Sequence, residues 1–286
     1  MIQTRQITIN DDEYPSLLKE ISSVPQRLWL MGAKLNNSEK RLTVVGTRNP
    51  TQYGRRVVNK LIKEVAEAGV TIVSGLAIGI DGMAHQAALD AKGKTIAIMP
   101  GGLDKVYPAS HRGLAERILK SGGTLISEYP EGYESFKENF VARNRIQSGI
   151  SEAVLIIEST EKSGTLITAQ FALDQDRSVM AIPGNIDSST SAGPNNLIKD
   201  GAIPVTCAQD ILDVLGVNRK AANVKAYKPA NDAEQAILVA IKDGIHSSED
   251  IQNRAELEVV EYTTNLTMLE IRGVIKQTNP GFWDLA

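Results

Sequence analysis

The chain lacks the features on which membrane-spanning, disulfide-bonded and metal-binding proteins depend. Cys207 is the only cysteine, which excludes an internal disulfide and a cysteine-built metal site and fits a reducing compartment. His, Asp and Glu are not clustered at the spacing of metal ligands, so we predict no metal site. Neither a bilayer-spanning apolar run nor an apolar signal core near the start is present, so we expect a cytoplasmic protein without membrane contact.

An overall excess of positive charge is also absent. The formal net charge is −3 at pH 7, so nucleic-acid binding would require a local basic patch rather than the charge of the whole molecule. The length of 286 residues allows one large domain or two unequal ones, and it is sufficient for a sizeable core.

Strand-like apolar runs alternate with helical patterns between residue 42 and about residue 215. Five such runs end in small-residue turns, at residues 43–46, 71–75, 95–102, 153–159 and 178–184. Amphipathic helical patterns are found at residues 57–69, 83–93, 114–123, 167–175 and 208–216. The alternation predicts an α/β, Rossmann-like fold, whose mainly parallel sheet of at least six strands has helices on both faces.

Changes in composition divide the chain into four expected segments. We expect an N-terminal extension over residues 1–40, with a short helix at Ser16–Ile21 and a strand at 28–32, followed by the Rossmann-like domain over 41–216. Residues 217–231 carry four basic residues without periodicity and are predicted to be a linker. Residues 232–286 combine three helical patterns with a short strand pair around Asn-Pro-Gly, which predicts a winged helix.

The predicted winged helix has the wrong charge for binding duplex DNA. Residues 228–286 hold five basic and ten acidic side chains, and the expected recognition helix at 258–270 carries three glutamates and no basic residue. Duplex binding needs Lys or Arg against phosphates, so we favour a protein-contacting or structural role.

Polar residues in the turns that follow the strands are candidate anion contacts. Arg48 follows the first strand at the edge where such sheets bind ligands, and it is either a phosphate clamp or a surface arginine. Ser163 and Gly164, beside Lys162, open a helix and are either phosphate donors or an ordinary N-cap. Asn195, in a loop before a helical turn, is a further candidate for the same rim.

The segment Phe136–Arg145 interleaves basic and aromatic residues in what we expect to be a turn. Lys137, Arg143 and Arg145 alternate with Phe136 and Phe140, the combination that single-stranded nucleic acid needs for its backbone and its unstacked bases. The structural alternative places Phe140 in the core and pairs the arginines with nearby acids, which are Glu131, Glu134 and Glu138.

Three enzyme-like patterns are incomplete. Residues 74–82 resemble a dinucleotide loop but lack GxGxxG and the acidic residue that would hold a ribose, so NAD is not expected. Residues 88–95 imitate the end of a phosphate loop but follow a helix and precede a strand, which excludes ATP hydrolysis by this route. Asp81 and His85, four residues apart, are either an acid–base pair or residues that cap the helix or orient a loop.

Taken together, the motifs from residue 14 to 215 resemble the DprA family, also called Smf or DNA-processing protein A. They occur in the family's order and spacing: GTR at 46–48, SGLAIGID at 74–81, PGGLD with YP at 100–108, SEYP at 127–130, FxxRNR at 140–145, SGTLITA at 163–169, IPG at 182–184 and GPNNLI at 193–198. The C-terminal segment resembles the small winged-helix domain of many members.

This resemblance implies a function that composition and spacing alone do not give. It implies a homodimer that is not an enzyme and uses no cofactor, that binds single-stranded DNA, protects incoming strands during natural transformation, and loads the RecA recombinase for homologous recombination. The implied DNA contacts are Arg48, Lys137, Phe140, Arg143, Asn144, Arg145, Lys162, Ser163, Gly164 and Asn195. Two alternatives remain at this point: a nucleotide-hydrolysing, phosphoribohydrolase-like enzyme, suggested by Pro100-Gly-Gly, and a small-nucleotide sensor.

Overall fold

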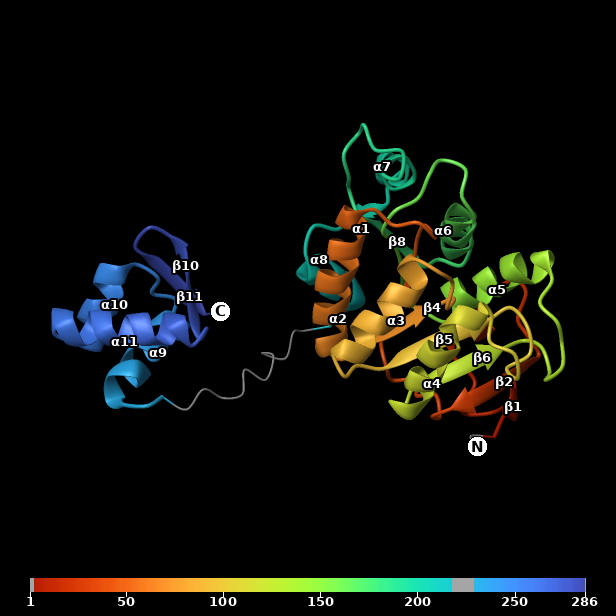
Figure 1. Ribbon diagram of the computed structural model, residues 1–286, viewed down its shortest axis with the longest axis horizontal. Helices are drawn as coiled ribbons and strands as arrows, with labels where there is room; N and C mark the ends of the chain where they lie inside the picture. The colour runs from red at the N-terminus through yellow and green to blue at the C-terminus, as the bar shows by residue number, and fades with distance from the viewer. Residues whose placement is uncertain (1–2, 218–228, 286) are drawn as a thin grey trace. The chain divides into compact units, whose positions relative to one another are not determined.

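The computed structural model describes residues 3–217 and 229–285, which belong to two compact units (Figure 1). The larger unit is Met1–Ala222 and the smaller is Asn223–Ala286. Most of the predicted linker, residues 218–228, lies outside the described residues, so its assignment stays a prediction.

The larger unit is built on one nine-stranded sheet in the order β1-β2-β6-β5-β4-β3-β7-β8-β9. The strands from β3 to β9 are parallel to their neighbours, whereas β2 is antiparallel to β6 and β1 to β2. The strands are β1 Arg5–Thr8, β2 Arg27–Gly32, β3 Arg41–Val45, β4 Thr71–Ser74, β5 Thr95–Met99, β6 Thr124–Ser127, β7 Ala153–Ile156, β8 Ser178–Ala181 and β9 Ile203–Pro204.

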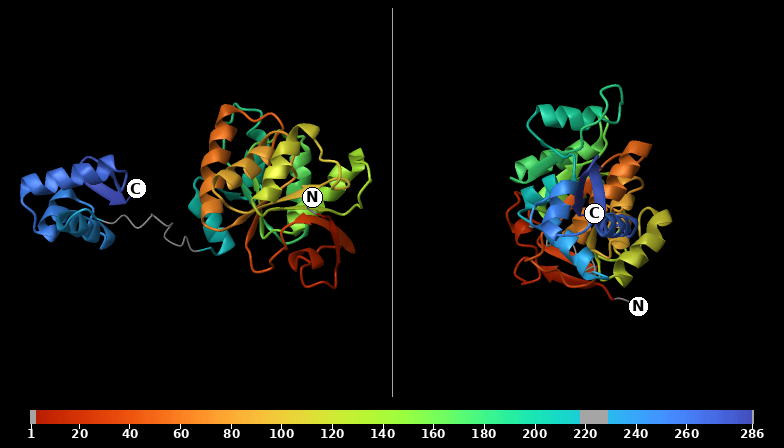
Figure 2. Two further views of the ribbon diagram at one scale, coloured as in Figure 1. Left: turned by 60° about the horizontal axis from the view of Figure 1, so that its bottom comes forward. Right: turned by 90° about the vertical axis from the view of Figure 1, so that its left-hand side faces the viewer.

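Helices cover both faces of this sheet because the side chains of its central strands are buried on both sides. Leu42 and Val44 of β3 face the helices α1 to α3 and α8, while Val45 faces α6 on the opposite side. Figure 2 shows the two helical layers from a second direction. The helices are α1 Gln52–Val57, α2 Lys63–Glu67, α3 Ile80–Asp90, α4 Arg112–Lys120, α5 Lys137–Gly149, α6 Gly164–Asp174, α7 Ala192–Lys199 and α8 Ala208–Leu215; one π turn, Val58–Ile62, joins α1 to α2, and two short 3₁₀ turns are Leu17–Lys19 and Ala109–His111.

The strand order contains one reversal, and it lies at β3. From β3 the chain adds β4, β5 and β6 on one side, and then β7, β8 and β9 on the other. Where the order reverses, the loops after two neighbouring strands leave toward opposite faces and open a crevice between them. The loops after β3 and β7 therefore enclose the expected ligand site.

The sequence identified the central strands but missed parts of the periphery. All five predicted runs coincide with strands, and the α/β fold class with a small C-terminal winged domain is confirmed. The first forty residues contribute β1 and β2 to the edge of the same sheet, beside β6. Trp29 lies in β2 and is half-buried there.

The expected turn over residues 136–145 is wrong, because this segment opens helix α5. The Asn139 side-chain oxygen accepts a hydrogen bond from the backbone N–H of Phe136 at 2.8 Å, which caps the helix. The buried face of α5 carries Asn139, Arg143 and Gln147 besides Ile146. A helix whose inward face is mostly polar gives no apolar periodicity, so the pattern did not reveal it.

The smaller unit has three helices and a two-stranded antiparallel sheet around its own core. Ile237, Leu266, Leu269 and Trp283 are among the buried residues. Its elements are α9 Asp232–Lys242, α10 Ser248–Ala255, α11 Val259–Ile271, β10 Ile275–Asn279 and β11 Phe282–Leu285. In the described part of the chain, no helix is both long enough and apolar enough to cross a bilayer.

Candidate nucleic-acid interface

A pocket of about 270 Å³ opens at the reversal of the strand order, and we call it the switch-point pocket. The loop after β3, helix α5 and the first turn of α6 form its walls. Its lining residues are Val45, Gly46, Thr47, Arg48, Ala77, Asp81, Phe140, Val141, Arg143, Asn144, Gln147, Ser163, Gly164, Thr165, Ile167 and Thr168.

The structure brings six of the ten predicted site residues to this pocket. These six are Arg48, Phe140, Arg143, Asn144, Ser163 and Gly164. The other four predicted residues, which are Lys137, Arg145, Lys162 and Asn195, do not line it. DNA contact by any of the ten stays a prediction.

Arg48 owes its position to two glycines that let the loop after β3 lie against α3. A Cβ added to Gly46 would come within 2.6 Å of the Ile80 side chain, and one added to Gly79 within 2.4 Å of the Thr47 carbonyl oxygen. Gly79 also has φ near +89°, which disfavours a side chain. The close approach leaves Arg48 exposed at the mouth of the pocket.

Arg143 lies beneath the pocket rather than on its rim, because its side chain is buried under the loop after β4. Its Nη1 donates to the carbonyl oxygens of Gly75 at 2.8 Å and Ile98 at 2.5 Å. Gly75 has to lack a side chain here, since a Cβ would lie 2.5 Å from that same nitrogen. Burial lowers the pKa of Arg143 to about 10, while the nearby Asp81 carboxylate opposes the shift. Arg143 therefore stays charged at neutral pH.

Asp81 and His85 do not form the acid–base pair that their spacing allowed. Asp81 accepts a hydrogen bond from the Gly75 backbone N–H at 3.1 Å, and burial raises its pKa despite the opposing charge of Arg143. His85 is fully buried, and its Nδ1 lies 2.6 Å from the Thr95 hydroxyl. Because that hydroxyl donates to the Ile72 carbonyl, His85 Nδ1 carries the proton. Burial, reinforced by the charges of His111 and Arg143, lowers the pKa of His85 to about 3.

Arg145 is engaged with an acid that the sequence analysis did not select. Its Nη2 lies 2.6 Å from Glu128 Oε1 in a partly buried ion pair. The expected partners were Glu131, Glu134 and Glu138, all close along the chain to α5. Glu128 follows β6 directly, so the sheet rather than the local sequence sets this pairing.

The remaining predicted residues take two different positions. Asn195 lies in helix α7 and not in the expected loop. It fixes the loop after β8, since its side-chain amide exchanges hydrogen bonds with the backbone of Gly184 at 3.0 and 3.1 Å. Lys137 and Lys162 are exposed, the first at the start of α5 and the second just before α6.

The first turn of α6 presents an N-terminus to the pocket. Ser163 caps it, because its Oγ accepts a hydrogen bond from the Thr165 backbone N–H at 3.2 Å. A Cβ added to Gly164 would meet nothing within 4 Å, so the backbone there is open to a ligand. The end of α6 thus supplies partial positive charge and N–H donors where Arg48 supplies full charge.

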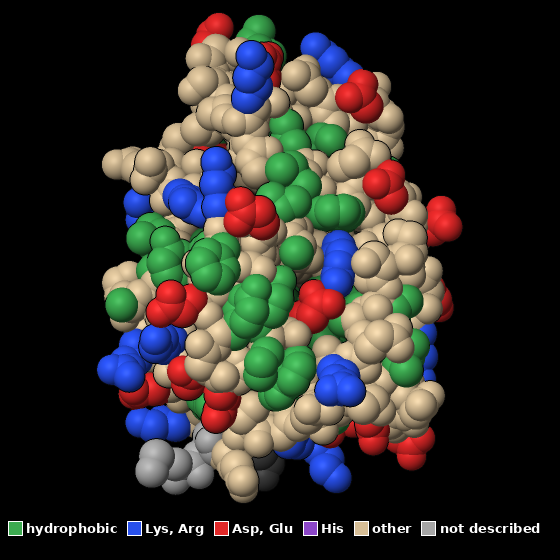
Figure 3. Space-filling model, turned by 90° about the vertical axis from the view of Figure 1, so that its right-hand side faces the viewer, with side chains coloured by type: hydrophobic (Ala, Val, Ile, Leu, Met, Phe, Trp, Pro, Cys, Tyr) green, Lys and Arg blue, Asp and Glu red, His purple; other side chains and the backbone are tan. Residues whose placement is uncertain are grey.

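Two site features escaped the sequence analysis. Gln147 is buried and lines the pocket, and its Nε2 has no hydrogen-bond partner among the described residues. Tyr107 packs edge-on against Phe140, with ring centroids 5.3 Å apart. Tyr107 belongs to the PGGLD–YP motif, but its pairing with a residue 33 positions away leaves no local signal. Tyr107 and Phe136 are exposed, in the loops before α4 and α5. Figure 3 shows a face of the molecule on which hydrophobic side chains gather among basic and acidic ones.

The exposed cation and the N–H donors of the pocket are chemically suited to holding an anion. Among the described residues, Asp81 is the only acid that lines the pocket, and it is buried and hydrogen-bonded to the loop after β4. The Ser163 hydroxyl serves as a helix cap and has no base among its hydrogen-bond partners in the described residues. No group of three or more His, Cys, Asp or Glu within residues 3–217 or 229–285 is placed to hold a metal ion.

Comparison with known proteins agrees with this architecture. The family model described as DNA recombination-mediator protein A matches residues 5–216. The chain is 44% identical over 210 residues to the DNA processing protein DprA of Bacillus subtilis, covering 73% of this chain and 70% of the relative. It is 37% identical over 284 residues to the protein Smf of Escherichia coli, covering 96% and 76%.

Two solved structures share the fold of the larger unit. DprA from Streptococcus pneumoniae aligns with a TM-score of 0.69 at 40% identity, over 74% of each chain. DprA from Helicobacter pylori aligns with a TM-score of 0.67 at 27% identity, over 75% of this chain and 96% of that one. That structure was solved to study how the H. pylori protein binds single-stranded DNA. Because the family match spans well over half of the chain and the relatives exceed 30% identity, the chain belongs to the DNA recombination-mediator protein A family, which includes DprA and Smf.

Proposed function

We propose that this protein binds single-stranded DNA and leaves it chemically unaltered. The observation that carries the proposal is the switch-point pocket, where Arg48 and the α6 N-terminus lie beside the ring of Phe140. Cations and N–H donors bind phosphate, and an exposed ring accepts any unpaired base. The H. pylori relative, which has a single-stranded DNA binding mode, supports the same ligand.

The ten predicted residues divide into three roles in this proposal. Arg48, Lys137 and Lys162 are exposed and contact phosphates, and Ser163, Gly164 and Asn144 add polar contacts at the pocket. Phe140 stacks on a base. Arg143, Arg145 and Asn195 bond to the protein itself and act as positioning residues: Arg143 holds the loop after β4, Arg145 holds Glu128 and Asn195 holds the loop after β8.

The biological role that we propose follows from family membership. The protein protects incoming DNA strands and loads the RecA recombinase onto them during natural transformation and homologous recombination, acting as a cytoplasmic homodimer. Residues 41–216 bind the DNA, residues 217–231 link the two units, and the winged-helix unit contacts another protein. The relatives named DNA processing protein support the DNA-processing part of this role.

The test is fluorescence anisotropy with labelled oligo-dT and a matched duplex across a salt series. We expect the single strand to bind more tightly than the duplex, and Arg48→Gln to weaken single-strand binding about tenfold while lowering the salt slope by about 0.7. Arg56→Gln is the matched control, since Arg56 is exposed on α1 and does not line the pocket. Equal affinity of Arg48→Gln and wild type would exclude the proposed site.

The hydrolytic alternative has its own readout. A phosphoribohydrolase would release free base from nucleoside monophosphates. We expect none, because Asp81 is the only acid that residues 3–217 and 229–285 place in the pocket, and it is held by the loop after β4. Base release that is lost in Asp81→Asn would establish the enzyme instead.

A further inference from the structure

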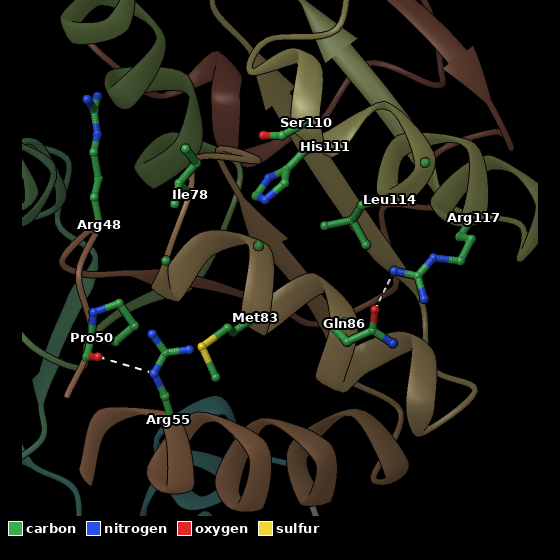
Figure 4. Close-up of a pocket in the computed structure, with 13 residues that line it drawn as sticks. Arg48, Pro50, Arg55, Ile78, Met83, Gln86, Ser110, His111, Leu114 and Arg117 are labelled. Atoms are coloured by element: carbon green, nitrogen blue, oxygen red, sulfur yellow. Dashed lines mark hydrogen bonds between the residues drawn. The ribbon is translucent and has the colours of Figure 1, made fainter. Parts of the chain in front are cut away.

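A second and larger cavity opens beside the switch-point pocket, and we call it the α3 groove. It has a volume of about 620 Å³, and α3 forms its floor between α1 and α4 (Figure 4). Gly82, Met83 and Gln86 line it from α3, Arg55 from α1, and Leu114 and Arg117 from α4. Nothing described above gives this groove a function.

The groove is cationic on both walls. Figure 4 shows Arg55 on the α1 side and Arg117 on the α4 side, with Arg48 at one end. In the described part of the chain, no Asp or Glu lines the groove, so no described acid neutralises these guanidinium groups there. Arg55 donates to the Pro50 carbonyl and Arg117 to the Gln86 side chain, neutral acceptors that orient the charges without cancelling them.

His111 adds a further polar group to the groove. Its Nδ1 lies 2.8 Å from the Leu76 carbonyl oxygen, and because a carbonyl only accepts, Nδ1 carries a proton. The ring is packed closely over α3, since a Cβ added to Gly82 would lie 2.6 Å from it. The absence of a side chain at Gly82 therefore allows the His111 ring to lie against α3.

The groove and the switch-point pocket share one residue, Arg48, which lines both. Between them lies a small hollow of about 50 Å³ lined by Arg48, Ile78, Tyr107 and Phe140. Ile78 and Tyr107 are each about half exposed, at 51% and 50%. We call Ile78, Tyr107 and Phe140 the ring ledge: an apolar surface with a cationic cavity on either side.

We propose that the α3 groove binds phosphates of the same DNA strand that occupies the switch-point pocket, with bases lying over the ring ledge between the two cavities. This inference rests on the proposed function and extends it to a second stretch of the strand. A polyanion fits better than a free nucleotide, because the cations are spread over opposite walls of a wide groove. Arg55 and Arg117 contact the phosphates, and Arg48 is shared by both stretches.

The test compares two strand lengths on the full-length protein. Labelled oligo-dT of about 4 and about 16 nucleotides, the two ends of the range of single-strand site sizes, is titrated by anisotropy in a salt series. The variant is Arg55→Gln with Arg117→Gln. The matched control is Arg56→Gln with Arg112→Gln, which removes the same charge from exposed neighbours on the same helices that do not line the groove.

We expect the Arg55/Arg117 variant to bind the long strand about tenfold more weakly, with a salt slope lower by about 1.4, and to bind the short strand as wild type does. The control pair should match wild type at both lengths. The inference would be overturned if the Arg55/Arg117 variant bound the long strand as tightly as wild type does. An equal loss of affinity at both strand lengths, or an equal loss in the Arg56/Arg112 control, would overturn it too.

Failure of the proposed function has a different signature. Arg48→Gln should weaken both lengths, because Arg48 lines both cavities. If Arg48→Gln is silent, the switch-point site and this extension of it both fall. If Arg48→Gln acts while the Arg55/Arg117 pair is silent, only the α3 groove is excluded.

Discussion

The two units each contain an element that nucleic-acid-binding proteins use, but only one of them has the charge for it. The larger unit places Arg48, Arg55 and Arg117 around cavities at the carboxyl edge of its sheet. In the smaller unit, α11 occupies the recognition-helix position of a winged helix, yet it exposes Glu261 and Glu270 together with apolar side chains.

The difference shows that fold alone does not locate a binding surface. The exposed side chains of α11 include Val259 at 63% and Val260 at 80%. These apolar side chains have no charge or donor to bind a phosphate. Rings and cations coincide in the larger unit, where Tyr107 and Phe140 lie beside Arg48. We therefore expect single-strand binding from the larger unit and protein contact from the smaller one.

The largest effect that we expect on one unit without the other is a loss of stability of the larger unit in Gly75→Ala. The new Cβ would lie 2.5 Å from the Arg143 guanidinium, which would have to leave its buried bonds to Gly75 and Ile98. We expect the larger unit to lose about 3 kcal/mol of unfolding free energy, as when a buried charge loses its partners. Calorimetry should show its transition moving to lower temperature while that of the smaller unit stays in place.

Gly113→Ala is the control for this change, because Gly113 lies in the first turn of α4, a Cβ there meets nothing within 4 Å, and alanine restricts the unfolded chain more than glycine does. It should leave stability unchanged or raise it by about 0.5–1 kcal/mol. A Gly75→Ala protein as stable as wild type would show that Arg143 can leave its position freely, and the account of the pocket floor would be wrong.

A smaller effect should follow from acidification, through a buried histidine of the larger unit. The pKa of His85 is lowered from 6.5 to about 3 in the folded protein. Between pH 6.5 and about pH 3, His85 is protonated in the unfolded chain but neutral in the folded one. The free energy of unfolding therefore falls as the pH falls through this range. The slope attributable to His85 is about 1.4 kcal/mol per pH unit.

Urea denaturation of wild type and His85→Gln between pH 7 and pH 4.5 isolates this contribution, because other titrating groups affect both proteins alike. As the pH falls, the free energy of unfolding of wild type should decline more steeply than that of His85→Gln, by about 1.4 kcal/mol per pH unit. His246→Gln is the matched control, since His246 is exposed in the smaller unit. Parallel slopes for wild type and His85→Gln would mean that burial does not hold His85 neutral.

The smallest of the three effects concerns two partly exposed rings, one in each unit. Phe140→Ala should weaken oligo-dT binding by about 1–3 kcal/mol without changing the salt slope, because stacking releases no counterions. Phe282→Ala removes a ring of 47% exposure from the smaller unit and should leave binding unchanged. A loss of equal size for both variants, measured by anisotropy, would remove the distinction between the units.

The sequence predicted those parts of the fold whose signals are local. Apolar runs located the central strands, since both faces of each are buried. β1 escaped because Ile7 is its only buried residue. α5 was misread as a turn because Asn139, Arg143 and Gln147 occupy its inward face.

The site was predicted less completely, because it depends on contacts between distant segments. Arg48, Phe140 and Ser163, which the motifs supplied, line one pocket, and their contact with DNA stays a prediction. The sequence does not show which cations remain accessible. Arg143 is buried because it bonds to carbonyls at the ends of two other strands, and Arg145 is paired with Glu128, which follows β6. The α3 groove joins three helices, and no single motif contains it.

The two tryptophans fall one to each unit, and this distribution provides separate optical reporters. Trp29 lies in β2 of the larger sheet, and Trp283 lies in β11 of the smaller unit. Trp29→Phe would leave intrinsic fluorescence that reports on the winged-helix unit, and Trp283→Phe would leave a signal from the sheet that forms the switch-point pocket. A partner that binds one unit can thus be assigned to it by emission alone, without cutting the chain or attaching a dye.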